Sequence, residues 1–350
     1  MEKHWQLIDT TLREGEQTPG VAFAPADRER ILDGLAAVGV DEAEVGIASP
    51  RAVCPARLIR YCRERHPQLR LSLWARCREE DIDVATRLAP DILSLSIPVS
   101  DIHLQRRLGV DRSWALQAME KSIDLARARG LRAAIGFEDA GRADRDFLLD
   151  MAGAAAARGV ARIRLADTLG TSSPGEFAAL VTAVAEAVPC PLAVHTHNDF
   201  GMATANAIAA LAAGASLADT VVLGLGERAG CARLEEVAGY LALVKNHANL
   251  HPEHLKPLAR LVAALSGRTI AANRPLIGEA LFTCETGLHL QGLHRDPCTY
   301  EPFPPERVDA TRRLLLGPKC GRRALAAFAA VEARQRRDAA GPPPQARKES

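Results

Sequence analysis

The chain has 350 residues, of which 47% are hydrophobic and 25% are charged, a composition typical of a folded globular protein. Its 44 basic and 43 acidic side chains leave a formal charge of +1, so no net field draws it to nucleic acid or to an anionic membrane. No apolar run approaches the ~20 residues of a membrane span, no signal segment follows Met1, and the 8 cysteines form no CxxC pair. We therefore expect a cytoplasmic protein with small-molecule substrates, which binds neither nucleic acid nor a membrane.

Short apolar segments alternate with segments of helical period along residues 5–246, in about eight pairs. Strands are expected at Trp5–Asp9, Ala43–Ile47, Leu71–Ala75, Ile92–Ile97, Ala133–Phe137, Arg162–Ala166, Leu192–His195 and Thr220–Leu223. The helices between them include Pro25–Val38, Ser113–Arg129, Arg145–Arg158, Ser173–Val188 and Ala203–Ala213. Parallel strands joined in this way by helices predict an α/β fold, a (β/α)8 TIM barrel.

The segments beyond the eighth pair indicate a second, smaller domain. His247–Ser266 is predicted to add one or two helices, and Arg307–Ala330 to belong to a small α-rich C-terminal subdomain. The last ten residues are rich in proline and charge and lack the apolar residues that a core needs. We expect a barrel domain at 1–270, a C-terminal subdomain at 271–335 and a disordered tail at 336–350.

Polar side chains follow almost every predicted strand. They are Asp9 through Gln17, Glu44, Trp74, Arg76, Ser96, Ser100, Glu138, Asp139, Asp167, Thr168, His195, His197 and Gly224–Arg228. Polar residues are common wherever a loop starts, yet barrel enzymes place their chemistry at the carboxyl ends of the strands. So many acids and bases in succession predict an active site at that end of the barrel.

Two of these residues, His195 and His197, indicate a metal site. Alternate residues of a strand share a face, so both imidazoles can reach one ion from the end of the strand. Glu14, in the turn after the first strand, can complete a set of two histidines and one carboxylate that leaves positions open for substrate. Asn198 and Asp199 are expected to hold the imidazoles in one tautomer. The alternative interpretation is a solvated histidine pair beside a surface cluster of salt bridges.

Several segments resemble one family. Asp9–Gln17 is similar to the signature turn of the metal-dependent barrel synthases and lyases, which include isopropylmalate synthase, homocitrate synthase and hydroxymethylglutaryl-CoA lyase. His195–Asp199 matches their HxHND element and Gly224–Gly230 their GxGERxGN element, and Leu316-Gly317 with Gly321-Arg322 resembles their LGKHSGR element. Ser96–Asp101 and Phe137–Asp144 are most similar to homocitrate synthases of the nitrogen-fixation type.

This resemblance implies an acyltransferase that condenses acetyl-CoA, its cosubstrate, with 2-oxoglutarate to give homocitrate and CoA. It also implies a homodimer and a role in nitrogen fixation. The implied metal ligands, for Mg, Mn, Zn, Co or Fe, are Glu14, His195 and His197. The implied catalytic residues are Arg13, Glu138 and His289, the last offered across the dimer, and the substrate-binding residues are Arg13, Gln17, Ser96 and Thr168.

The sequence also departs from the family pattern. Cys231 replaces the asparagine that ends GERxGN and is either a softer metal ligand or a spectator. Cys284, Lys319 and Ala193 replace further family residues, the last a glutamate often found in homocitrate synthases. Three alternatives therefore stay open: condensation with another 2-oxo acid, as in isopropylmalate or citramalate synthase; the same chemistry in the cleavage direction; and a catalytically impaired paralogue that acts as a binding protein.

Overall fold

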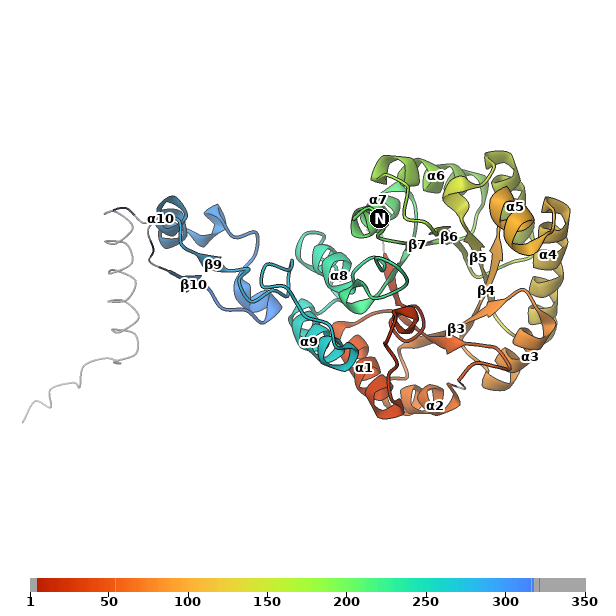
Figure 1. Cartoon of the computed structure of the whole chain (residues 1–350), viewed down its shortest axis with the longest axis horizontal. Coiled ribbons are helices and arrows are strands. Elements are labelled where there is room, and N and C mark those ends of the chain that lie inside the picture. Colours follow the sequence, from red (N-terminus) through yellow and green to blue (C-terminus); the bar gives the residue numbers. More distant parts are fainter. Residues whose placement is uncertain (1–4, 54, 316, 318–320, 322–350) are drawn as a thin grey trace, which may run out of the picture. The chain divides into compact units, whose positions relative to one another are not determined.

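Eight parallel strands close into a barrel in chain order, and helices lie on the outside of the ring (Figure 1). The computed structural model describes residues 5–53, 55–315, 317 and 321. The strands are β1 (Gln6–Asp9), β2 (Glu42–Ile47), β3 (Arg70–Arg76), β4 (Ile92–Pro98), β5 (Ala133–Glu138), β6 (Ile163–Asp167), β7 (Leu192–Thr196) and β8 (Leu217–Thr220). The predicted (β/α)8 barrel is therefore confirmed.

Local sequence signals set the ends of the helices. The helices are α1 (Pro25–Val38), α2 (Ala56–Arg65), α3 (Glu79–Leu88), α4 (Arg112–Ala128), α5 (Arg145–Ala157), α6 (Pro174–Ala187), α7 (Ala203–Ala213), α8 (Leu234–Leu243) and α9 (Leu255–Ser266). Ser173 and Glu176 form a capping box at the start of α6, and Gly39 ends α1 in a left-handed conformation. Among the described helices, none is long and apolar enough to cross a membrane.

The eighth strand differs from the prediction of Thr220–Leu223. It comprises Leu217–Thr220 and pairs with β1 along its whole length. The apolar run after Thr220 was misleading, because the chain leaves the sheet there and Leu223 takes a positive φ of 61°. Asp219 was the unexpected strand residue: it is 2% exposed, and an ion pair with Arg164 and a hydrogen bond from His195 compensate for its burial.

Charged residues cross the interior of the barrel. Glu42 on β2 accepts two hydrogen bonds, of 2.8 and 2.6 Å, from Arg162, which immediately precedes β6. Because β2 and β6 are not neighbours in the sheet, this bidentate pair spans the space that the strands enclose. One level nearer the carboxyl ends of the strands, Glu44 and Arg164 repeat the pairing at 3.1 Å. The barrel thus carries fixed charge directly beneath the end where the predicted site residues lie.

A second compact unit begins at Ala271. Its strands β9 (Thr283–Cys284) and β10 (Arg313–Leu314) pair in parallel, and its helix α10 is Gly287–Arg295. The predicted segment Arg307–Ala330 begins here with a short 3-10 turn at Pro305–Val308 and with β10 rather than with a long helix. Residues 322–330 and the tail 336–350 lie outside the described residues, so the expected limits of 271–335 stay a prediction.

Candidate metal and active site

A cavity of about 310 Å³ at the carboxyl ends of the strands brings the predicted barrel residues together. Its lining includes the barrel residues that the resemblance implies as substrate, metal or catalytic residues, namely Arg13, Glu14, Gln17, Ser96, Glu138, Thr168, His195 and His197, but not Cys231, the possible further ligand. It also includes Trp74, Arg107, Arg164 and Glu227. The cavity is therefore walled largely by polar and charged side chains.

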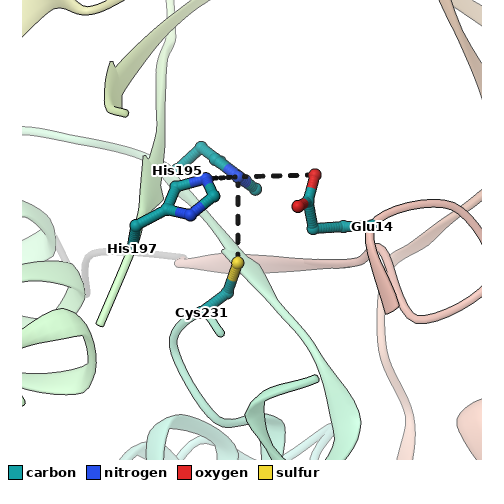
Figure 2. Close-up of side chains that lie close together, drawn as sticks. All are labelled: Glu14, His195, His197 and Cys231. Atoms are coloured by element: carbon teal, nitrogen blue, oxygen red, sulfur yellow. Dashed lines mark hydrogen bonds and ion pairs between the residues drawn. The ribbon is translucent and has the colours of Figure 1, made fainter. Parts of the chain in front are cut away.

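Four buried side chains converge on one point beside this cavity: Glu14, His195, His197 and Cys231 (Figure 2). Their potential ligand atoms all lie within 4.8 Å of one another. The Nε2 atoms of the two histidines are 3.1 Å apart, and Glu14 Oε2 lies 3.9 Å from His195 Nε2. This is the one such cluster of three or more residues in the part of the chain that the structure describes.

The chemistry of these side chains fits a divalent cation. His195 Nδ1 lies 2.9 Å from Asp219 Oδ2, and donation of the Nδ1 proton to that carboxylate leaves a lone pair on Nε2. Burial, followed by the neighbouring His195, lowers the pKa of His197 to about 3, so His197 is neutral at pH 7. The buried Oε1 of Glu14 has no hydrogen-bond partner among the described residues. A cation between these atoms would satisfy the two facing nitrogens and the unpaired oxygen together.

The groups that orient the histidines differ from those expected. Asn198 Oδ1 accepts a hydrogen bond from the backbone of Ala203, and Asp199 pairs with Arg228 at 2.8 Å. Both side chains therefore hold loops rather than imidazoles, and Asp219 orients His195. The sequence does contain a signal that Asp219 has a bonding partner, because a single carboxylate inside an apolar barrel strand needs one. The predicted eighth strand begins at Thr220, three residues after the observed start at Leu217, so Asp219 lay outside the prediction.

Buried charges of alternating sign connect Glu14 to Asp219. Arg13 pairs with Glu14, and its Nε donates to Glu44 Oε1 at 2.7 Å. Glu44 Oε2 accepts from Arg164 Nη1 at 3.1 Å, and Arg164 Nε lies 3.1 Å from Asp219 Oδ2. Burial acts to raise the pKa of Glu44, but the two guanidinium groups outweigh it and lower that pKa to about 2. Glu44 is therefore the ionised centre of this network.

Substitution of Glu44 by alanine is expected to lower the free energy of unfolding by about 3–5 kcal/mol, because Arg13 and Arg164 would be left buried without their shared carboxylate. Urea unfolding measures this loss. Because folding depresses the pKa of Glu44 to about 2, its contribution is present at neutral pH and is lost as the pH falls from about 4.5 toward 2. The variant should lack this part of the pH dependence.

Glu29→Ala is the matched control, since Glu29 pairs with the exposed Arg57 on the surface. It should leave the urea midpoint nearly unchanged. If Glu44→Ala were as stable as this control, the buried network would not contribute to the fold as described.

The opposite wall of the cavity is built around Glu138, the last residue of β5. Ser96 Oγ donates to Glu138 Oε1 at 2.8 Å, and Arg107 Nη2 lies 2.5 Å from Oε2. Thr168 Oγ1 accepts the backbone N–H of Asp139 at 2.8 Å, which leaves its own proton free to be donated. Sequence reasoning missed Arg107, because it lies in the π-helical segment His103–Leu108 rather than at the end of a strand.

His289 lies in the second unit, in α10, where its ring packs against Tyr300 with centroids 4.1 Å apart. Both rings line a cavity of about 350 Å³ within that unit. The implied role of His289 at a neighbouring barrel therefore stays a prediction. Of the element near residues 316–322, only Gly317 and Gly321 are described, and Lys319 lies outside the described residues.

The fold and the cavity define a class: a TIM barrel with acids, arginines and a candidate metal cluster at the carboxyl ends of its strands. Comparison with known families agrees. The model of the HMGL-like family matches residues 4–262, and that of the homocitrate synthase post-HMGL domain-like family matches residues 276–334. The chain belongs to the HMGL-like family and carries the C-terminal domain of the homocitrate synthase group.

Named relatives extend across almost the whole chain. The homocitrate synthase of Frankia alni is 42% identical over 318 residues, which cover 91% of this chain and 90% of that protein. The 2-isopropylmalate synthase 2 of Caldanaerobacter subterraneus is 36% identical over 93% of this chain and 84% of its own length. The structure of hydroxymethylglutaryl-CoA lyase from Pseudomonas aeruginosa has the same fold, with a TM-score of 0.68, 24% identity and coverage of 76% of this chain and 94% of that chain. The chain is an enzyme of the condensing acyltransferase type.

Proposed function

We propose that this enzyme is a homocitrate synthase, which condenses acetyl-CoA with 2-oxoglutarate and hydrolyses the thioester to release homocitrate and CoA. Its similarity to the Frankia alni homocitrate synthase supports this choice. The observation that carries it is Arg107 in the cavity wall, whose side chain is 49% exposed and contacts Glu138 through Nη2 alone, so its other N–H groups can bind a second carboxylate. 2-Oxoglutarate carries such a carboxylate, whereas 2-oxoisovalerate offers only a branched alkyl group.

The oxo acid would bind between the candidate metal ligands and Arg13. Glu14, His195 and His197 would hold the divalent ion, which when bound polarises the 2-oxo group. Glu44 and Glu14 fix the guanidinium of Arg13, so its charge can stabilise the oxygen that becomes the alkoxide. The hydroxyl of Thr168 is free to donate to a substrate carboxylate.

Glu138 is suited to the proton transfer on the acetyl group. Its carboxylate is held by Ser96 and Arg107 at the cavity wall and can take a proton from the acetyl methyl group. The carbanion so formed attacks the carbonyl carbon of the oxo acid, a new C–C bond forms, and the carbonyl oxygen gains a proton. Water then cleaves the thioester bond and releases CoA. Gln17, which also lines the cavity, can hold the substrate by a neutral hydrogen bond.

Arg107 is the cavity cation best placed to recognise the distal carboxylate, because its side chain is 49% exposed and lies outside the buried network of Arg13 and Arg164. Arg107→Met is expected to raise the KM for 2-oxoglutarate by about 10–100-fold, the value of one charge-assisted hydrogen bond. The KM for pyruvate, which lacks that carboxylate, should change little, and any fall in kcat from the lost contact with Glu138 should be the same for both acids. Steady-state kinetics with both acids measures the difference.

Arg106→Met is the matched control, since Arg106 is an exposed neighbour in the same turn and does not line the cavity. It should leave both KM values unchanged. If Arg107→Met raised the KM for both acids equally, Arg107 would not be the residue that binds the distal carboxylate of 2-oxoglutarate.

The choice of substrate is tested by comparing 2-oxo acids at fixed acetyl-CoA with metal-supplemented enzyme. We expect the highest kcat/KM with 2-oxoglutarate. A higher value with pyruvate or 2-oxoisovalerate would make the enzyme a citramalate or isopropylmalate synthase instead. An absence of product with every acid would favour the impaired paralogue.

The proposal extends to a cytoplasmic homodimer that serves nitrogen fixation and in which the partner subunit's His289 assists this barrel. The likeness of Ser96–Asp101 and Phe137–Asp144 to nitrogen-fixation homocitrate synthases supports it. The described cysteines Cys62, Cys77, Cys190, Cys231, Cys284 and Cys298 are all free thiols, which suits a reducing compartment. Light scattering of the full chain measures the oligomeric state.

A further inference from the structure

The thiol of Cys231 belongs to the candidate metal cluster rather than lying behind it. Its side chain is buried, with the residue 3% exposed, and Sγ lies 4.0 Å from His195 Nε2 (Figure 2). A tetrahedral ion separates two nitrogen ligands by about 3.4 Å and a nitrogen from a sulfur ligand by about 3.6 Å, given the usual bond lengths. The observed separations of 3.1 Å between the imidazoles and 4.0 Å to the sulfur are close to both values.

The backbone holds this thiol in place. Cys231 forms an antiparallel bridge with His197, and hydrogen bonds from Asn198 to Gly230 (2.8 Å) and from Ala232 to Thr196 (3.2 Å) join the two segments on either side of it. The position of the sulfur is therefore set by the same strand end that presents the histidines. It does not depend on the flexible end of a long side chain.

Glycine at position 226 leaves room for the sulfur. A Cβ atom at Gly226 would lie 3.0 Å from Cys231 Sγ and 3.5 Å from Glu14 Cγ, and its φ of +148° disfavours any other residue. The loop from Gly224 therefore passes close to the cluster without filling it. The sulfur and the carboxylate of Glu14 face the same space.

We infer that Cys231 is the fourth protein ligand of the ion, which would then take the 2-oxo acid as a fifth ligand, and that it makes the site selective for thiophilic metals, Zn²⁺, Co²⁺ or Fe²⁺, over Mg²⁺ and Mn²⁺. A thiolate is a soft ligand, whereas Mg²⁺ prefers an octahedron of oxygen atoms. On binding, the thiol proton leaves to solvent and a metal–sulfur bond forms. The two anionic ligands, Glu14 and Cys231, then balance the charge of a divalent ion.

This inference rests on the proposed function only in requiring that Glu14, His195 and His197 hold a metal. It is tested by titrating the chelator-stripped full chain with one equivalent of Co²⁺, in a non-thiol reductant, while the absorption spectrum is recorded. Wild type should show visible d–d bands together with an intense near-ultraviolet band from thiolate-to-cobalt charge transfer. Cys231→Ser should keep the d–d bands and lose the charge-transfer band, which also shows that the variant is folded at the site.

The matched control is Cys190→Ser, because Cys190 is a free, half-buried thiol that is not part of the cluster. It should keep both kinds of band. The Co²⁺ affinity of Cys231→Ser should fall by more than about 100-fold, since losing only an outer-shell partner costs about 10–100-fold. The Mg²⁺ affinity should stay unchanged in the same variant.

The outcomes distinguish the claim that Glu14, His195 and His197 hold a metal from the claim that Cys231 is a further ligand. Wild type with d–d bands but no charge-transfer band would overturn the assignment of Cys231 and leave the three-residue site standing. Wild type with no Co²⁺ spectrum would overturn both. A charge-transfer band that survives in Cys231→Ser and disappears in Cys190→Ser would place the thiolate elsewhere.

Discussion

Replacement of His197 by alanine is expected to reduce kcat by at least about 1000-fold, because the ion that polarises the oxo acid supplies several kcal/mol to the transition state and would lose one of its fixed ligands. The fold should survive, since His197 stands outside the ion pairs that connect Arg13, Glu44, Arg164 and Asp219. Turnover of 2-oxoglutarate with acetyl-CoA, together with the metal content of the protein, measures the effect.

The control for this substitution is His254→Ala, because His254 is an exposed histidine before α9 and far along the chain from the cavity residues. It should retain the activity and the metal content of wild type. Activity of His197→Ala within a few-fold of this control, with normal metal content, would exclude His197 as a ligand that the reaction needs.

Replacement of Glu138 by glutamine is expected to lower kcat by about 100–10,000-fold, the usual contribution of a positioned proton-transfer group. The amide keeps the shape of the side chain and its contact with Ser96 but cannot take the methyl proton. Metal content should not change, because Glu138 is not part of the candidate cluster.

Exchange of the acetyl-CoA methyl hydrogens with D₂O, in the presence of the oxo acid, reports on this proton step separately from C–C bond formation. Glu138→Gln should abolish any exchange that wild type catalyses and should slow formation of product. Glu186→Gln, on the exposed face of α6, is the control and should behave as wild type. Turnover by Glu138→Gln at the wild-type rate would assign the proton transfer to another residue.

The barrel was predictable because its signal is repeated. Apolar segments of strand length recur between helical segments, and features such as the capping box of Ser173 and Glu176 lie within a few residues of the boundary that they set. The predicted bounds of the eighth strand were wrong because the information that sets this strand is not local. Its sequence, Leu217-Ala218-Asp219-Thr220, contains a carboxylate whose burial depends on Arg164, 55 residues earlier in the chain.

The candidate site shows the same division between local and distant information. His195 and His197 were found because they are two residues apart on one strand, and Glu14 because it follows the first strand within a dense polar turn. The roles expected of Asn198 and Asp199 were wrong, since the hydrogen bonds of their side chains go to Ala203 and Arg228 rather than to an imidazole. Contacts such as that of Arg107 with Glu138 join separate βα units, and only the folded chain reveals them.

The most direct measurement is to supply acetyl-CoA labelled with ¹³C in the methyl group, together with 2-oxoglutarate, to the chelator-stripped chain and to the same chain after metal is restored. Mass spectrometry then identifies the product. We predict labelled homocitrate and free CoA from the metal-restored protein, and neither from the stripped protein. Unchanged acetyl-CoA in both samples, or equal formation of homocitrate without metal, would contradict a metal-assisted condensation at Glu14, His195 and His197.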